Sequence, residues 1–225
     1  MMVARERVVL NFHGIGEPSA VVPADEVLYW CPSDLWPRLA DAIVEARSIG
    51  DAVVEVTFDD GNLSDVEQAL PALLERNLSA TFFVCAGRIG RPGYLGPEGL
   101  RSLLTSGMRV GSHGFDHVDL RSADASVLRR ETRGSADVIG SVTGMPVEDF
   151  ALPFGSYDRR VLSALRGYRS VFTSDRGRAG DGWLVPRESY VRSWGTADII
   201  SLTSGRGRSL VRLRRRAARL VKSLR

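Results

Sequence analysis

The chain has 225 residues, of which 44% are hydrophobic, and it carries a formal net charge of +3. It lacks an apolar run as long as a transmembrane helix requires, so we expect a soluble globular protein. The N-terminal segment has no secretory-signal pattern, and Cys31 and Cys85 lie far apart without metal-ligand spacing, which together favour a cytoplasmic protein.

The basic residues gather at the C-terminal end. Residues 205–225 hold nine of the 30 Lys and Arg residues and no acidic residue, whereas residues 1–204 hold 21 basic and 27 acidic residues. The first part therefore carries a net charge of −6 and the second +9. We predict a folded domain over residues 1–204 and a basic tail over residues 205–225.

Patterns typical of strands and helices alternate along the first part of the chain. Short apolar runs predict seven strands, over residues 8–12, 53–58, 81–84, 108–111, 150–153, 171–173 and 184–192. Helical periodicity predicts helices between them, over residues 33–47, 64–74, 97–106, 122–142 and 158–166. This alternation predicts a parallel α/β architecture, and seven strands suit a small barrel.

Local signals predict how two of these helices begin. Ser33 is expected to cap the first helix, and Ser64 with Glu67 has the spacing of a capping box at the start of the second. Pro71 is expected to bend that second helix.

Polar residues follow the predicted strands at the points where these end, and they include every histidine of the chain. The residues are His13, Asp59, Asp60, His113, His117 and Asp158. Because the carboxyl ends of parallel strands meet at one edge, we expect these side chains to lie together. Two imidazoles and a carboxylate can hold a divalent ion, and a further carboxylate and imidazole can transfer protons, as a metallohydrolase requires. For the aspartate pair alone, the alternative is a turn with a helix cap.

Three motifs resemble those of the polysaccharide deacetylases, the NodB-homology or carbohydrate esterase family 4 enzymes. They are TFDDG at 57–61, HGFDH at 113–117 and FALPFG at 150–155, and the resemblance covers about residues 7–192. It implies a distorted (β/α)7 barrel that binds a divalent metal through one aspartate and two histidines and removes N- or O-acetyl groups from sugars. By motif position, it implies Asp59 as the general base, Asp60, His113 and His117 as metal ligands, and the backbone around Phe154 as part of the oxyanion-binding wall.

The sequence departs from the family pattern in two places. The third motif usually has an arginine two residues before its proline, where this chain has Ala151; Arg187 is our candidate substitute. The late motif with a catalytic histidine is also absent. Some members resemble a circular permutation in which that strand comes first, and NFHGIG at 11–16 fits this pattern. His13 is therefore our candidate general acid, with a histidine that merely packs in its loop as the alternative.

The predicted function is metal-dependent hydrolysis of an N-acetyl or O-acetyl group on a sugar, a glycan or a lipid-linked saccharide. Zinc is the expected ion, and cobalt, nickel or manganese are alternatives, because the same ligands accept several metals. The aromatic residues Tyr29, Trp30 and Trp183 are candidates for stacking on a sugar ring. Two other functions stay open, a non-catalytic carbohydrate-binding protein of the same fold and a metal-dependent amidase that acts on a non-sugar acyl amide.

The tail has the pattern of an amphipathic basic helix. Leu210, Leu213, Ala217, Leu220 and Leu224 recur at spacings of three and four, with arginines on the remaining faces. Nucleic acid is a poor partner for it, because the rest of the chain is acidic. An anionic membrane surface fits better, since each basic residue near such lipid contributes about 1 kcal/mol. The alternatives are a solvated or frayed terminus and a helix whose leucines close the bottom of the barrel.

We therefore expect the full chain to co-sediment with anionic liposomes, and a chain that ends at Ser204 to lose most of this binding. Added salt should release the full chain, because the attraction is electrostatic. Equal binding by the two chains, or binding that salt leaves unchanged, would contradict a peripheral contact with the inner membrane face.

Overall fold

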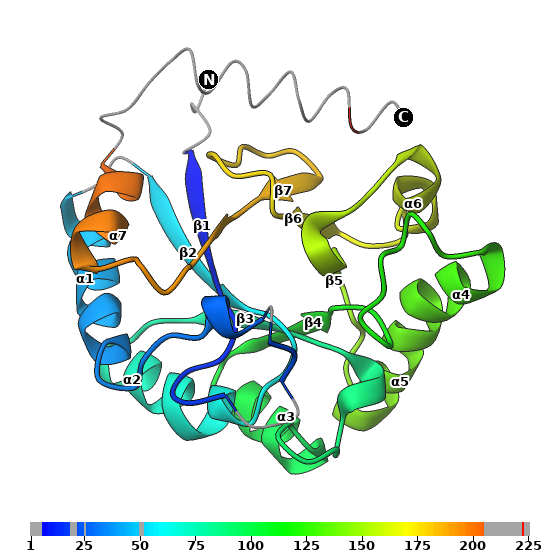
Figure 1. Ribbon diagram of the computed structural model, residues 1–225, viewed down its shortest axis with the longest axis horizontal. Coiled ribbons are helices and arrows are strands. Elements are labelled where there is room, and N and C mark those ends of the chain that lie inside the picture. The colour runs from blue at the N-terminus through cyan, green and yellow to red at the C-terminus, as the bar shows by residue number, and fades with distance from the viewer. Residues whose placement is uncertain (1–5, 19–21, 25, 50–51, 205–221, 223–225) are drawn as a thin grey trace.

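The computed structural model describes residues 6–18, 22–24, 26–49, 52–204 and 222. Its strands form one parallel sheet in the order β7-β6-β5-β4-β3-β2-β1-β8. The sheet curls into a nearly closed barrel with helices around it, as Figure 1 shows. The strands are β1 (Arg7–Phe12), β2 (Val53–Phe58), β3 (Ala80–Val84), β4 (Arg109–Ser112), β5 (Asp149–Ala151), β6 (Ser170–Thr173), β7 (Leu184–Pro186) and β8 (Glu188–Ser189).

The helices follow the strands, as the alternation of patterns predicts. They are α1 (Trp36–Ile49), α2 (Leu70–Glu75), α3 (Pro97–Thr105), α4 (Ala125–Arg129), α5 (Ser135–Thr143), α6 (Arg159–Ala164) and α7 (Thr196–Thr203). The sequence did not predict α7, which packs beside α1. In the part of the chain that the structure describes, no helix is both long and apolar enough to cross a membrane.

The last predicted strand, over residues 184–192, is two short strands rather than one. β7 pairs with β6, whereas β8 pairs with β1 at the other edge of the sheet. The described residues therefore contain eight strands instead of seven, because this run changes its partner at Arg187. The change of partner draws the two edges together and places Arg187 at the seam of the barrel.

Both faces of the sheet are buried, which explains why its strands read as continuous apolar runs. On the outer face, Phe12, Phe58 and Phe82 stack in sequence under the helices, with ring centroids 4.8–5.6 Å apart. On the inner face, a separate buried cluster fills the barrel; it contains Val9, Phe83, Ala151, Phe172, Ala179 and Val185. The neighbours Phe82 and Phe83 thus serve opposite sides of the same strand.

The predicted helix starts are wrong in detail. α1 begins at Trp36, three residues after Ser33, and Ser64 makes no capping hydrogen bond. The Ser64 hydroxyl instead accepts a hydrogen bond from the Ile15 N–H at 3.1 Å, which ties the loop after β2 to the loop after β1. A π-helical turn over Asp65–Ala69 precedes α2, so Pro71 lies in the first turn of a helix rather than at a bend within one.

The long helix expected over residues 122–142 begins later and is interrupted. Asp124 caps α4 by accepting from the N–H groups of Ser126 and Val127. A π-helical turn over Arg130–Gly134 then separates α4 from α5. The predicted amphipathic tail lies outside the described residues except for Lys222, whose ammonium contacts Asp175 at 2.9 Å.

Candidate metal and catalytic site

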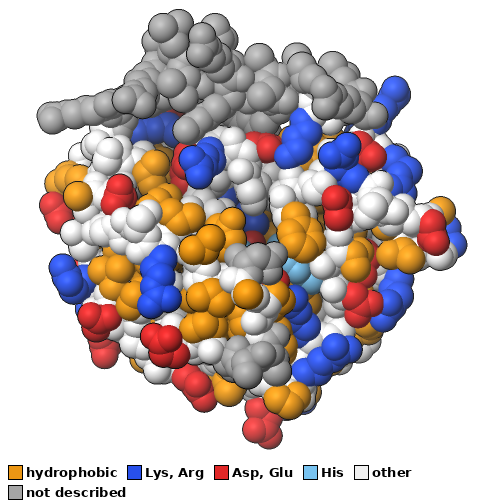
Figure 2. Space-filling model, in the orientation of Figure 1, with side chains coloured by type: hydrophobic (Ala, Val, Ile, Leu, Met, Phe, Trp, Pro, Cys, Tyr) orange, Lys and Arg blue, Asp and Glu red, His pale blue; other side chains and the backbone are white. Residues whose placement is uncertain are grey.

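A cavity of about 330 Å³ opens at the carboxyl ends of the strands. Figure 2 views this face, with histidine side chains visible near its centre. The cavity is lined by His13, Glu26, Tyr29, Asp59, Asp60, His113, His117, Leu152, Phe154, Ser174, Arg176, Ser189 and Val191. The structure therefore brings together all three histidines and the aspartate pair, as the strand-end pattern predicts.

Asp158 is not part of this group. Its carboxylate accepts a hydrogen bond from the Val161 N–H at 2.8 Å and caps α6. The expectation that it joins the other strand-end residues is therefore wrong, since the ordinary capping role of aspartate explains it.

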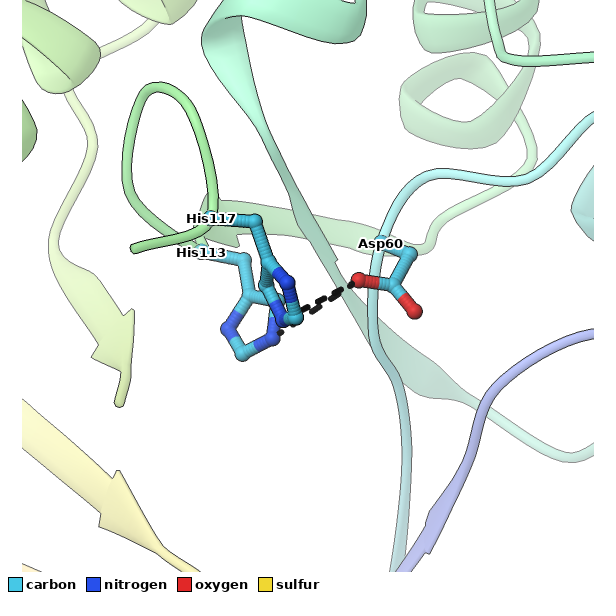
Figure 3. Close-up of side chains that lie close together, drawn as sticks. All are labelled: Asp60, His113 and His117. Carbon is cyan, nitrogen blue, oxygen red and sulfur yellow. Dashed lines mark ion pairs between the residues drawn. The ribbon is translucent and has the colours of Figure 1, made fainter. Parts of the chain in front are cut away.

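Asp60, His113 and His117 converge on one point, as Figure 3 shows. The Asp60 Oδ1 atom lies 3.9 Å from His113 Nε2 and 3.6 Å from His117 Nε2. Ligand atoms bound tetrahedrally at the usual zinc distances lie roughly 3.3 Å apart, so small side-chain shifts would close this set around an ion. Two imidazoles and one carboxylate also leave coordination positions open, which is the pattern of a catalytic rather than a structural zinc site.

Unusual backbone conformations present these ligands. Asp60 and His117 have φ values of 79° and 57°, in the left-handed region that non-glycine residues seldom adopt. The loop between the two histidines is held by the buried carboxylate of Glu131, which accepts from the N–H groups of Phe115 and Asp116 at 2.7 and 3.0 Å. Gly114 passes so close to Glu131 that a Cβ atom there would lie 2.7 Å from its carboxylate oxygen.

The Nδ1 atoms of the two imidazoles have different neighbours. His113 Nδ1 lies 2.9 Å from the Ala151 carbonyl oxygen, which as an acceptor fixes the proton on Nδ1 and leaves Nε2 free to face Asp60. His117 Nδ1 lies 3.6 Å from Glu26 Oε1. Burial, reinforced by the nearby His113, lowers the pKa of His117 to about 3. The neutral imidazole is the form that binds metal.

Arg88 connects two of the acidic groups around this cluster. Its guanidinium donates to Asp60 Oδ1 at 3.1 Å and lies 3.7 Å from Glu26 Oε1. Burial alone would raise the pKa of Asp60, but its interactions with the surrounding histidines and with the Arg88 guanidinium lower it instead. Asp60 is therefore ionised, as a metal ligand must be.

Asp59 is held by Arg187 through two parallel hydrogen bonds. The guanidinium donates to Oδ1 at 2.7 Å and to Oδ2 at 2.8 Å, and both residues are almost completely buried. Asn11 donates a third hydrogen bond to Oδ2 at 3.0 Å. Burial would raise the pKa of Asp59, but the charge of Arg187, with a smaller contribution from the neighbouring His113, holds it well below the usual range. The expected contact between Arg187 and Asp59 is thus present.

His13 lies on the wall of the cavity beside Tyr29, with the two ring centroids 5.0 Å apart. Its Nδ1 atom is buried and has no hydrogen-bond partner among the residues that the structure describes. Removal from water lowers the pKa of His13, against the opposing effect of Asp60 and Asp59. Tyr29 is half-buried and lines the cavity.

Trp30 does not face the cavity. It is 5% exposed, and its ring covers Gly14 so closely that a Cβ atom at that position would lie 2.2 Å from it. The expectation that Trp30 stacks on a sugar is therefore wrong, because its ring packs under the loop after β1. Trp183 is also used in packing, and its indole N–H donates to the Tyr168 carbonyl.

Phe154 stands at the rim of the cavity. Its side chain is 59% exposed, its ring centroid lies 4.5 Å from that of His117, and its φ is 56°. The segment from Pro153 to Gly155 turns the chain after β5, and Phe154 lies beside His117 in the lining of the cavity.

Four residues that surround the site were missed by the sequence analysis. Asn11 carried a signal, because it is a polar residue inside an apolar run that forms a buried strand. Glu26, Arg88 and Glu131 carried none, since each comes from a loop or helix whose position depends on the fold.

The model of the polysaccharide deacetylase family matches residues 46–170, more than half of the chain. The chain belongs to the polysaccharide deacetylase family. This match begins after β1, so the permuted position of the His13 strand stays a prediction.

Individual relatives agree with this family. The Bacillus subtilis protein YxkH is 24% identical over 76% of this deacetylase-family chain and 65% of its own length. The chitooligosaccharide deacetylase of Azorhizobium caulinodans is 28% identical over 60% of this chain and 62% of its own. The chain thus spans less than two thirds of the length of these relatives. The Streptococcus pyogenes deacetylase PplD, solved with acetate, has the same fold, with a TM-score of 0.77 and 20% identity over 89% of this chain and 99% of that one.

Replacing Arg187 with methionine is expected to lower the free energy of unfolding by about 3–5 kcal/mol, because it leaves the buried Asp59 carboxylate without its charged partner. The pKa of Asp59 is depressed in the folded wild type, so the stabilisation is fully present above about pH 4, the range of an unfolded aspartate, and is lost as the pH falls below it. The free energies of unfolding of the wild type and of the Arg187→Met variant should therefore become more similar as the pH falls below about 4. Denaturant unfolding at several pH values measures it.

Arg7→Met is the matched control. Arg7 also contacts a carboxylate across neighbouring strands, at 3.1 Å from Glu55, but that pair is about one quarter exposed. Loss of this Arg7–Glu55 pair should lower the free energy of unfolding by less than about 1 kcal/mol. Equal losses in the two variants would contradict the importance of the buried pair.

Proposed function

We propose that this protein is a metal-dependent deacetylase that hydrolyses an N-acetyl or O-acetyl group of a saccharide. One observation carries the proposal: an ionised, arginine-held aspartate lies beside an Asp60–His113–His117 cluster inside a cavity. The Asp59 Oδ2 atom lies 3.8 Å from His113 Nε2, so the two groups border the same small space. The names of relatives support a saccharide substrate, since they include a chitooligosaccharide deacetylase and a peptidoglycan-N-acetylglucosamine deacetylase.

Asp60, His113 and His117 would hold the ion, with zinc as the proposed metal. When bound, a divalent ion would polarise the acetyl carbonyl and lower the pKa of water at the site. The chain contributes the orientation of the ligands, through the Ala151 carbonyl on His113 and the Glu26 carboxylate near His117.

Asp59 would act as the general base that takes a proton from the attacking water. Arg187 and Asn11 use hydrogen bonds to fix the carboxylate in one orientation, and the arginine charge keeps it ionised at neutral pH. Arg187 supplies the positive charge beside Asp59 that position 151 cannot supply, because Ala151 lacks a polar side chain. The absence of the usual motif arginine therefore gives little support to a non-catalytic protein.

His13 would act as the general acid that protonates the leaving group. A buried imidazole with a lowered pKa is a strong acid in its protonated form, which favours transfer to a departing amine. The backbone around Phe154 would line the side where the oxyanion forms, and Tyr29 would contact the sugar ring.

We also propose that the enzyme works in the cytoplasm at the inner face of the membrane. The support is the basic composition of residues 205–225, and the liposome experiment above tests it.

The roles of these residues separate into metal binding and proton transfer. Asp59→Asn and His13→Gln should each reduce acetate release from N-acetylated saccharides by about 100-fold or more while the bound metal stays. His113→Ala should lose the metal. Elemental analysis of the purified variants and an acetate assay measure both quantities. Asp158→Asn is the control, since Asp158 caps α6 away from the cavity and asparagine caps equally well.

An Asp59→Asn variant with activity close to wild type would contradict the role of base. A His113→Ala variant that keeps its full metal content would contradict the ligand set.

The contact of Glu26 with His117 gives a separate expectation. Glu26→Gln should weaken metal binding by about 10- to 100-fold, because the carboxylate orients the imidazole and increases its basicity. Competition with a chromophoric chelator measures the Kd, and Glu98→Gln on the exposed face of α3 is the control. An unchanged Kd would show that Glu26 does not orient the ligand.

A further inference from the structure

The acidic groups of the cavity already have cationic partners. Asp59 is bound by Arg187, and Asp60 and Glu26 both lie against Arg88. A fourth acidic side chain does not line the cavity, as far as the described residues go. Arg176, the arginine of the lining, therefore has no acidic side chain left to balance among the described residues that line the cavity.

Arg176 is exposed, and its guanidinium makes no hydrogen bond or ion pair with any residue that the structure describes. Its neighbours differ in this respect. Asp175 accepts a hydrogen bond from the Tyr157 hydroxyl at 2.6 Å and contacts Lys222, and Arg178 donates to Glu6 and to the Thr203 carbonyl. The loop after β6 thus uses the side chains on both sides of Arg176 for its own structure and leaves that guanidinium at the rim of the cavity.

The backbone at Arg176 is constrained. Its φ is 55°, a left-handed conformation that is unfavourable for an arginine and needs support from the surroundings. That support comes from the seam of the barrel: the Arg176 N–H donates to the Arg187 carbonyl at 3.2 Å, and the Gly177 N–H donates to Glu188 at 2.7 Å. Arg187 is the residue that holds Asp59, so the position of Arg176 is coupled to that of the candidate base.

We propose that Arg176 binds an anionic group, a carboxylate or a phosphate, on the saccharide that carries the acetyl group. This inference rests on the proposed function, and it adds that the substrate is an acidic saccharide. A planar guanidinium with two parallel donors suits either group and is unlike a lysine in this respect. The cavity of about 330 Å³ is small for a ligand pocket, so substituents beside the reacting sugar reach its rim, where Arg176 lies.

The experiment compares three saccharides. The disaccharide of N-acetylglucosamine and N-acetylmuramic acid carries a carboxylate, N-acetylglucosamine 1-phosphate carries a phosphate, and N,N′-diacetylchitobiose is neutral. Binding to the zinc-loaded full chain is measured by calorimetry in an Asp59→Asn background, in which turnover is stopped. Initial rates of acetate release from the chain that keeps Asp59 provide kcat/KM independently.

At least one anionic saccharide should bind tenfold or more tightly than the neutral one. Which of the two does so shows whether Arg176 binds a carboxylate or a phosphate. Arg176→Ala should weaken that binding by about 10- to 100-fold, the effect of a hydrogen-bonded charge, and should change the neutral saccharide less than about twofold. Arg176→Lys should restore part of the preference. Arg129 is an exposed arginine on α4, and Arg129→Ala should change the binding of neither the anionic nor the neutral saccharide.

Two results would overturn the inference: anionic saccharides that bind no more tightly than the neutral one, or an Arg176→Ala variant that weakens all three equally. The outcome is separable from that of the proposed function. Selective binding without acetate release by the chain that keeps Asp59 contradicts the deacetylase, and the role of Arg176 stands. Acetate release without any preference for an anionic saccharide contradicts the role of Arg176 alone.

Discussion

The buried ion pair between Arg187 and Asp59 joins the closure of the barrel to the chemistry of the site. Removing two charges from water is costly, and this cost is met only where the geometry is close to ideal and the remaining hydrogen-bonding groups are satisfied. Both conditions hold, because the guanidinium contacts both carboxylate oxygens and also donates to Asn11 at 2.8 Å. The pair can form only if β7 and β8 bring the two edges of the sheet together. Fold and site therefore depend on the same contact.

The barrel interior explains why the pair can exist at this depth. Beneath the guanidinium lie the rings of Phe83 and Phe172, with centroids 5.5 and 6.0 Å from the Arg187 Cζ atom. They exclude water and add a cation–π attraction. Thr57 completes the polar layer by donating to Asn11 Oδ1 at 2.8 Å. An apolar plug thus fills the barrel, and a layer of polar side chains closes it on the side where the histidines stand.

Strained backbone is concentrated at this same end of the barrel. The non-glycine residues with positive φ include Asp60, His117, Phe154 and Arg176, and all four line the cavity. Each such conformation costs on the order of 1–3 kcal/mol and persists only where surrounding contacts enforce it. Glu131 supplies these contacts for the histidine loop, and the hydrogen bond to the Arg187 carbonyl supplies one for Arg176. The direction of the functional side chains is therefore maintained by structure outside the motifs.

The sequence by itself determined the strands, the parallel α/β class and the group of histidines and aspartates at the strand ends, because these depend on local pattern and on the polarity of a parallel sheet. It also pointed to Arg187, through the alanine at position 151. Tertiary structure alone decided the division of the last strand, the burial of Trp30 and the positions of Glu26 and Arg88. These features depend on contacts between distant segments. β8 pairs with β1 at the other edge of the sheet, and Glu26 lies next to His117 although it comes 91 residues earlier in the chain. Local sequence patterns do not predict contacts between distant segments, since residues such as Glu26 and Arg88 would fit equally well in a solvated loop.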